Sequence, residues 1–135
     1  ASRRQHLEEV IKPALKEGYL VICDRYVDSS LAYQGYARGL GIDEVYNLNY
    51  YATGGLLPDL TIFIDVNPEE GIARISKNNR DKDRLDLETL AFHHRVREGY
   101  LQLVKRFPER IKRIDGNKNI EELYSEIRKV IFENL

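Results

Sequence analysis

Hydrophobic and polar positions along the chain follow two periods, one typical of strands and one typical of helices. Short apolar runs, each followed directly by an aspartate, predict three strands at residues 19–23, 60–64 and 110–114. Apolar residues at helical spacing predict helices over residues 7–15, 43–53, 68–77, 87–106 and 120–135. Because strands and helices alternate, the pattern predicts an α/β fold with a parallel sheet covered by helices.

Charged residues follow the predicted strands at the place where such sheets bind ligands. Ligands of open α/β sheets lie in the crevice beyond the carboxyl ends of the strands. Asp24 and Arg25 follow the first predicted strand, Asp65 follows the second and Asp115 follows the third. We therefore expect these four residues at the edge of the functional site.

Composition limits the possible classes of protein. The 135 residues, 42% hydrophobic and 32% charged, suit a single domain covering residues 1–135. A formal net charge of -1 argues against a protein that binds nucleic acid through bulk charge. The single cysteine, Cys23, excludes an internal disulfide framework and is interpreted as a core thiol, so a cytoplasmic setting is expected. No apolar stretch has the ~20 residues of a membrane span.

The chain contains no methionine anywhere, and its opening stretch, ASRRQHLEEVIKPALKEG, has the pattern of a helix that is already under way. We expect the natural start to lie further upstream, although processing or chance also explains the composition.

Asp24 and Arg25 each have a functional and a structural interpretation. A carboxylate after a buried strand can hold a hydrated Mg²⁺ near phosphates, or it can cap the next turn. The guanidinium of Arg25 offers a planar set of donors that suits a phosphate, or it can form an ion pair with Asp24.

The residues that follow could form the walls of a nucleotide site. Ser29 and Ser30 supply hydroxyl groups, Tyr33 an aromatic face and Gln34 an amide that could contact the edge of a base. Helix capping by the serines and core packing by the tyrosine are the structural alternatives.

A polar segment with three arginines, RISKNNRDKDRLD, separates two predicted helices. Phosphoryl transfer requires positive groups near the transferred oxygens, and a closing loop can deliver them. Arg74, Arg80 and Arg84 lie in this segment, which could also be a solvated surface turn.

Taken together, these motifs resemble those of the bacterial thymidylate kinases. DRYVDSSLAYQGYARGLG resembles the family's monophosphate site, and ASRRQH its helix with a base-reading arginine. GLLPDLTIFIDV is similar to its fourth strand, NNRDKDRLDLE to its lid and RIDGNKNIEEL to the loop near adenine.

The resemblance implies a role for each matching residue. Arg25 should bind the phosphate of thymidine monophosphate (dTMP), and Arg3 should contact the carbonyl side of thymine. Ser30 and Gln34 should lie near the base, and Tyr33 near the sugar and base. Asp24 should assist Mg²⁺, with ATP as the phosphoryl donor. In the lid, at about residues 74–86, Arg80 and Arg84 are the expected catalytic arginines.

The resemblance also implies a P-loop NTPase-like three-layer fold, cytoplasmic location and a homodimer. The family's phosphate loop, GxxxxGK[ST], has no match here, so we expect the chain to be the later part of a longer enzyme with an incomplete sheet. The family's strand order, 2-3-1-4-5, assigns the three predicted strands as its third, fourth and fifth. Two alternatives stay open: another nucleoside or nucleoside-monophosphate kinase, and a non-catalytic nucleotide-binding module.

Overall fold

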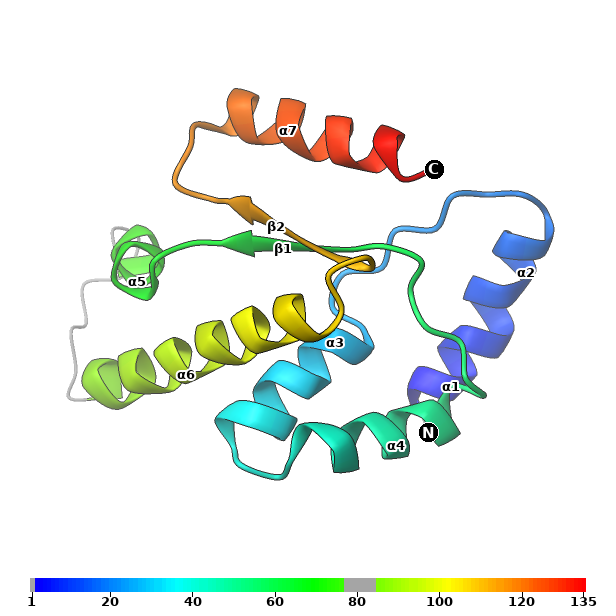
Figure 1. Ribbon diagram of the computed structural model, residues 1–135, viewed down its shortest axis with the longest axis horizontal. Coiled ribbons are helices and arrows are strands. Elements are labelled where there is room, and N and C mark those ends of the chain that lie inside the picture. Colours follow the sequence, from blue (N-terminus) through cyan, green and yellow to red (C-terminus); the bar gives the residue numbers. More distant parts are fainter. Residues whose placement is uncertain (1, 77–84) are drawn as a thin grey trace. The chain divides into compact units, whose positions relative to one another are not determined.

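The computed structural model describes residues 2–76 and 85–135. The chain divides into two compact units, Ala1–Pro58 and Asp59–Leu135. Figure 1 shows that the first unit is formed by helices and connecting segments, whereas the second contains both strands.

The first unit begins with three helical segments that run on without a break. These segments are α1 (Ser2–His6), the π-helix η1 (Leu7–Ile11) and α2 (Lys12–Lys16). His6 and Lys12, at the two junctions, both have right-handed helical backbone angles. Gly18 ends the run with φ +90°, a conformation that glycine adopts without steric cost. This confirms the helix predicted over residues 7–15.

The second half of the first unit packs a π-helix closely against another helix. The elements are α3 (Val27–Ser30), the π-helix η2 (Leu31–Ala37) and α4 (Ile42–Ala52). A Cβ on Gly35 would lie 3.1 Å from the Ile42 Cα, so glycine permits the close approach of η2 to the start of α4. The buried apolar side chains of this unit are Leu7, Ile11, Val27, Leu31, Ala32, Ala37 and Val45.

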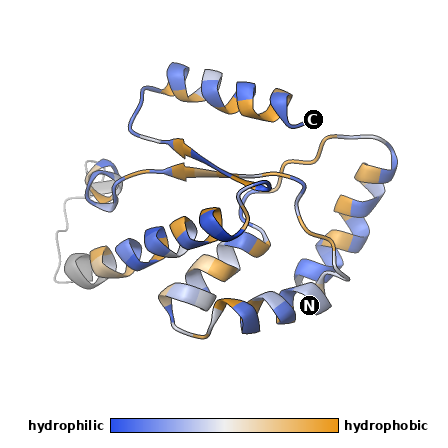
Figure 2. Ribbon diagram, viewed as in Figure 1, coloured by the Kyte–Doolittle hydropathy of each residue, from blue (hydrophilic) through white to orange (hydrophobic). Residues whose placement is uncertain are grey.

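The prediction of a strand at residues 19–23 is wrong for the structure as described. These residues form neither a helix nor a strand and pair with no strand among the described residues, and Ile22 is 82% exposed. Cys23 is also exposed, so its interpretation as a core thiol is wrong as well. The physical reason is that a strand needs a hydrogen-bonding neighbour, which an apolar sequence alone does not supply. Figure 2 shows this hydrophobic segment after α2.

The second unit is built on two parallel strands, as predicted. Strand β1 (Thr61–Asp65) pairs with β2 (Ile111–Asp115), with Thr61 opposite Ile111 and Asp65 opposite Asp115. The two strands therefore end at the same level. Their adjacency agrees with the expected fourth and fifth places in the sheet.

Three helices accompany this strand pair. They are α5 (Pro68–Ser76), α6 (Leu85–Arg106) and α7 (Ile120–Glu133), close to the predicted bounds. Both α6 and α7 pack on β2, and Figure 1 shows them on opposite sides of the strand pair. Buried Phe63, Val96, Leu103, Ile111 and Ile114 form the core of the unit.

No helix within residues 2–76 and 85–135 combines the length and the hydrophobicity that crossing a bilayer requires.

Candidate functional site

A cluster of polar side chains in the first unit joins three helices around Arg3. The Arg3 Nη1 atom donates to the Ser30 Oγ at 3.0 Å and also to the Asn49 Oδ1. Arg3 lies on α1, Ser30 on α3 and Asn49 on α4, so residues far apart in sequence meet here. Arg3 and Ser30, both predicted as site residues, are therefore neighbours.

Tyr26 forms an aromatic wall beside Arg3. The Arg3 Cζ lies 5.5 Å from the centroid of the Tyr26 ring, which suits a cation–π interaction. The Tyr26 hydroxyl donates to the Leu56 carbonyl oxygen at 3.3 Å. Burial raises the pKa of Tyr26 above its ordinary value, although the positive charge of Arg3 acts in the opposite direction. The tyrosine is thus a neutral wall at neutral pH.

Arg25 has an unusual backbone and an aromatic partner. Its φ of 61° places it in the left-handed region, which costs a residue with a side chain about 1–2 kcal/mol. Its Cζ lies 4.4 Å from the centroid of the Tyr33 ring, so the predicted residues Arg25 and Tyr33 are also brought together. The alternative interpretation of Arg25, an ion pair with Asp24, does not occur among the described residues. Backbone strain of this kind is concentrated at functional sites.

The other two predicted residues of this unit are exposed. Asp24 lies in the bend before Arg25, and Gln34 follows Tyr33 on η2. Within the described residues, neither side chain forms a hydrogen bond that ties it to Arg3, Ser30 or Arg25. Both side chains are therefore available to a ligand.

Asp65 does not lie open at a site edge, so that part of the expectation is wrong. Its side chain is 1% exposed and accepts from the Arg97 Nε at 2.6 Å and from the Arg113 Nε at 2.7 Å. Burial acts to raise the pKa of Asp65, but the hydrogen bonds from both arginines outweigh it and hold the pKa below the ordinary value. The carboxylate links β1 to α6 and β2.

Asp115, the third aspartate at a strand end, stabilises a turn. Its Oδ1 accepts from the Asn117 backbone N–H at 2.9 Å. Asp115 therefore caps the turn after β2, as an aspartate at the end of a strand commonly does.

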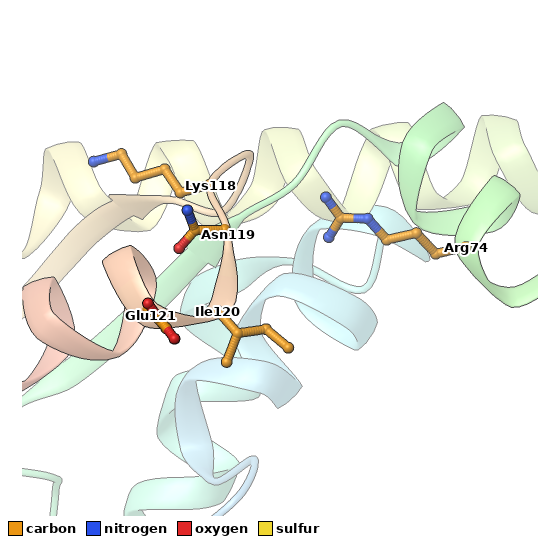
Figure 3. A pocket seen from close by; sticks show the side chains of 5 residues that line it. All are labelled: Arg74, Lys118, Asn119, Ile120 and Glu121. Atoms are coloured by element: carbon orange, nitrogen blue, oxygen red, sulfur yellow. The ribbon is translucent and has the colours of Figure 1, made fainter.

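A pocket of about 590 Å³ in the second unit lies at the start of α7. It is a hollow that lies open to solvent rather than an enclosed cavity. Figure 3 shows Arg74 reaching from α5 toward the loop that holds Lys118 and Asn119. Ile120 and Glu121 complete the lining. The Asn119 side chain caps α7 by accepting from the Glu122 backbone N–H at 2.8 Å. The lining thus combines a guanidinium, an apolar surface and hydrogen-bonding groups.

On α6, His94 forms a hydrogen bond with Glu69 of α5. His94 Nε2 lies 2.5 Å from the Glu69 Oε1, and this hydrogen bond lowers the pKa of Glu69. Among the described residues, no three His, Cys, Asp or Glu side chains form a group that could hold a metal ion. Arg80 and Arg84, the predicted lid arginines, lie outside the described residues.

The chain as a whole matches a solved structure of known class. The crystal structure of thymidylate kinase from Ehrlichia chaffeensis matches 96% of this chain and 58% of that chain, with a TM-score of 0.69 and 32% sequence identity. The fold is therefore an α/β fold of the P-loop NTPase class, of which this chain contributes two paired parallel strands.

The family model for thymidylate kinase matches residues 1–127, and the chain belongs to the thymidylate kinase family. A thymidylate kinase of Clostridium novyi (strain NT) is 57% identical over 129 residues, which are 95% of this chain and 63% of that protein. A thymidylate kinase of Bacillus velezensis is 57% identical over the whole chain, which spans 64% of that protein. The chain thus covers just under two thirds of the length of these relatives.

Sequence reasoning missed Asn49 and Tyr26, which surround Arg3. Tyr26 lies within the recognised motif, and its position directly after Arg25 could have marked it as a wall of the site. Asn49 lies on a different helix, 46 residues from Arg3, and no local pattern of residues indicates that contact.

Proposed function

We propose that this chain is the part of a thymidylate kinase that binds dTMP and the base of ATP, and that the complete enzyme transfers a phosphoryl group from ATP to dTMP to give thymidine diphosphate. The observation that carries the proposal is the hydrogen bond between Arg3 and Ser30, at 3.0 Å. It joins two separate family motifs, within residues 1–127 that match the family model.

Arg25 would bind the phosphate of dTMP. Its guanidinium is free of carboxylate partners in the described part of the chain, and it lies over Tyr33 instead. A planar fork of donors forms paired, charge-assisted hydrogen bonds with phosphate oxygens. The left-handed backbone at Arg25 supports this role because such strain persists where function requires a fixed orientation.

Arg3, Ser30 and Gln34 would recognise thymine, with Tyr33 beside the sugar. A pyrimidine has a flat face and a few edge atoms, so donors fixed against an aromatic wall can distinguish it from other bases. The guanidinium of Arg3, held by Ser30 and Asn49, supplies such donors for a carbonyl oxygen.

The pocket at the start of α7 would hold the adenine base of ATP. Arg74 offers a planar cation that can stack on an aromatic base, and Ile120 offers an apolar contact. This assignment follows the likeness of RIDGNKNIEEL to the family's adenine loop.

Asp24 would hold the Mg²⁺ that accompanies the nucleotide phosphates. Its exposed single carboxylate fits this ion, because Mg²⁺ near phosphates keeps several waters and uses only one or two carboxylates. When bound, the ion would neutralise negative charge on the phosphates. Arg80 and Arg84 are proposed to stabilise the charge of the transferred phosphoryl group.

The complete enzyme is proposed to be a cytoplasmic homodimer, as the family resemblance implies. A kinase acting on a different monophosphate is the second candidate, and the contact proposed between Arg3 and a carbonyl group of thymine would favour dTMP over it.

Replacing Arg25 with alanine in the complete enzyme tests the phosphate assignment. We expect the Michaelis constant for dTMP to rise by about 10- to 100-fold, because one charge-assisted pair of hydrogen bonds, about 1.5–3 kcal/mol, is lost. The Michaelis constant for ATP should change far less. An equal rise in the Michaelis constants for both substrates would show that Arg25 has a general structural role. The matched control is Arg128→Ala, which removes an exposed arginine that also lies over an aromatic ring, that of Phe132 on α7.

A further inference from the structure

The Asn49 side chain is held in one orientation by its own helix. Its Nδ2 donates to the Val45 carbonyl oxygen at 2.8 Å, one turn earlier on α4. A primary amide has one donor end and one acceptor end. Because the donor end faces the helix, the acceptor oxygen is the end that faces Arg3.

Asn49 and Ser30 together determine which edge of Arg3 is left for a ligand. The Nη1 atom of an arginine carries two hydrogens, and here Nη1 has two acceptors, the Ser30 Oγ and the Asn49 Oδ1. The Nε and Nη2 atoms of Arg3 have no hydrogen-bond partner in the described part of the chain. They carry the three remaining N–H groups, on a fork that also lies 5.5 Å from the Tyr26 ring centroid.

We propose that Asn49 is a positioning residue that fixes Arg3 for recognition of the base. A long arginine side chain loses rotamer freedom when a ligand orders it, and prior ordering reduces that loss on binding. Asn49 supplies this order from a helix separate from those of Arg3 and Ser30. The inference rests on the proposed function, because it takes the carbonyl side of thymine as the group that Arg3 contacts.

A purely structural role for Asn49 makes a different prediction. If the side chain only joined α4 to α1, its loss would lower the stability of the protein and weaken the binding of every ligand of the site by the same factor. A positioning role instead alters the preference between two ligands that differ at the edge Arg3 reads.

The test measures that preference in the complete enzyme with two ligands. These are dTMP and 5-methyl-2′-deoxycytidine monophosphate, which differ only at the base edge that bears the 4-oxo or 4-amino group. Isothermal titration calorimetry gives both dissociation constants, and their ratio measures the discrimination. The variants are Asn49→Ala, Arg3→Ala, the double variant and Asn49→Asp. Asn47→Ala is the control, since Asn47 is exposed on the same helix.

We expect Asn49→Ala to reduce the discrimination by about tenfold, the effect of losing one hydrogen bond to a charged group. The double variant should discriminate no less than Arg3→Ala, because both substitutions remove the same interaction. Asn49→Asp keeps an acceptor oxygen and should restore part of the discrimination. The melting temperature of Asn49→Ala should match that of Asn47→Ala.

Three results would overturn the inference. If Arg3→Ala abolishes discrimination while Asn49→Ala leaves it unchanged, Asn49 does not position Arg3, and the proposed function stands. Equal weakening of both ligands by Asn49→Ala, with a lowered melting temperature, would show a structural role alone. If Arg3→Ala also leaves the ratio unchanged, the proposed role of Arg3 fails, and the inference fails with it.

Discussion

Arg25 combines a left-handed backbone with a guanidinium held over an aromatic ring. The backbone conformation, with φ of 61°, is unfavourable for any residue with a Cβ, whereas the position over Tyr33 orients the charged group. Under the proposed function, this conformation costs stability but directs the guanidinium toward the phosphate. Such an exchange of stability for function is common at binding sites.

Two substitutions at residue 25 separate the backbone strain from the loss of the side chain. Both Arg25→Gly and Arg25→Ala remove the guanidinium, but only glycine adopts positive φ without steric cost. We expect Arg25→Gly to be more stable than Arg25→Ala by about 1 kcal/mol in chemical denaturation of the complete enzyme. Both should bind dTMP with similarly reduced affinity. An alanine variant as stable as the glycine variant would show that residue 25 is not strained.

At the residue scale, the sequence indicates those site residues that belong to a recognised motif. The pairing of Arg25 with Tyr33, eight residues later, lies within one recognised motif. The Arg3–Ser30 contact joins two recognised motifs. The sequence pattern does not indicate Asn49, because its contact with Arg3 depends on tertiary packing. It also does not indicate the burial of Asp65, because the two arginines that bind this carboxylate, on α6 and β2, are distant in sequence.

Strand β1, strand β2 and helix α6 are joined by one buried carboxylate. Asp65 at the end of β1 accepts hydrogen bonds from Arg97 on α6 and from Arg113 on β2. The carboxylate is buried, whereas both arginines are partly exposed and keep contact with water. Removing the acid therefore leaves two cations that water can solvate, which limits the loss of stability.

Asp65→Asn should lower the free energy of unfolding of the complete enzyme by roughly 1–3 kcal/mol at neutral pH. Since the folded-state pKa of Asp65 lies below its ordinary value, the ionised carboxylate stabilises the fold above about pH 4. This contribution is lost as the pH falls through the lowered pKa. The difference between wild type and Asp65→Asn should accordingly shrink in acid.

The control for this prediction is Asp59→Asn, which makes the same change at an exposed position just before β1. It should leave the free energy of unfolding nearly unchanged. A stability difference for Asp65→Asn that stays constant from neutral pH to strong acid would contradict the account of the ionised carboxylate.

At the scale of elements, helices were predicted well because their hydrogen bonds are local. The bounds of α5, α6 and α7 follow from periodicity and from glycine, proline and capping signals. Strand formation depends on a partner, and the strand that the pattern predicts at residues 19–23 does not form in the structure. The π-helical form of η2, which carries Tyr33 and Gln34, has no signal in the sequence pattern.

At the scale of the whole molecule, the two units carry side chains that suit different ligands of a kinase. The first unit provides arginines, a hydroxyl and aromatic walls, which suit a pyrimidine monophosphate. The second unit provides a pocket lined by Arg74 and the start of α7, which suits the base of a phosphoryl donor. The residues that match the thymidylate kinase family model, 1–127, include the first unit and most of the second.

Phosphoryl transfer from ATP to a panel of nucleoside monophosphates tests the central claim most directly. The complete enzyme should be assayed with dTMP, dCMP, dAMP and dGMP, with kcat/KM measured for each. The account predicts that dTMP is preferred over dCMP by at least about tenfold, because Arg3 donates to a carbonyl oxygen that cytosine lacks at that position. A preference for any other monophosphate, or transfer to none of them, would contradict it.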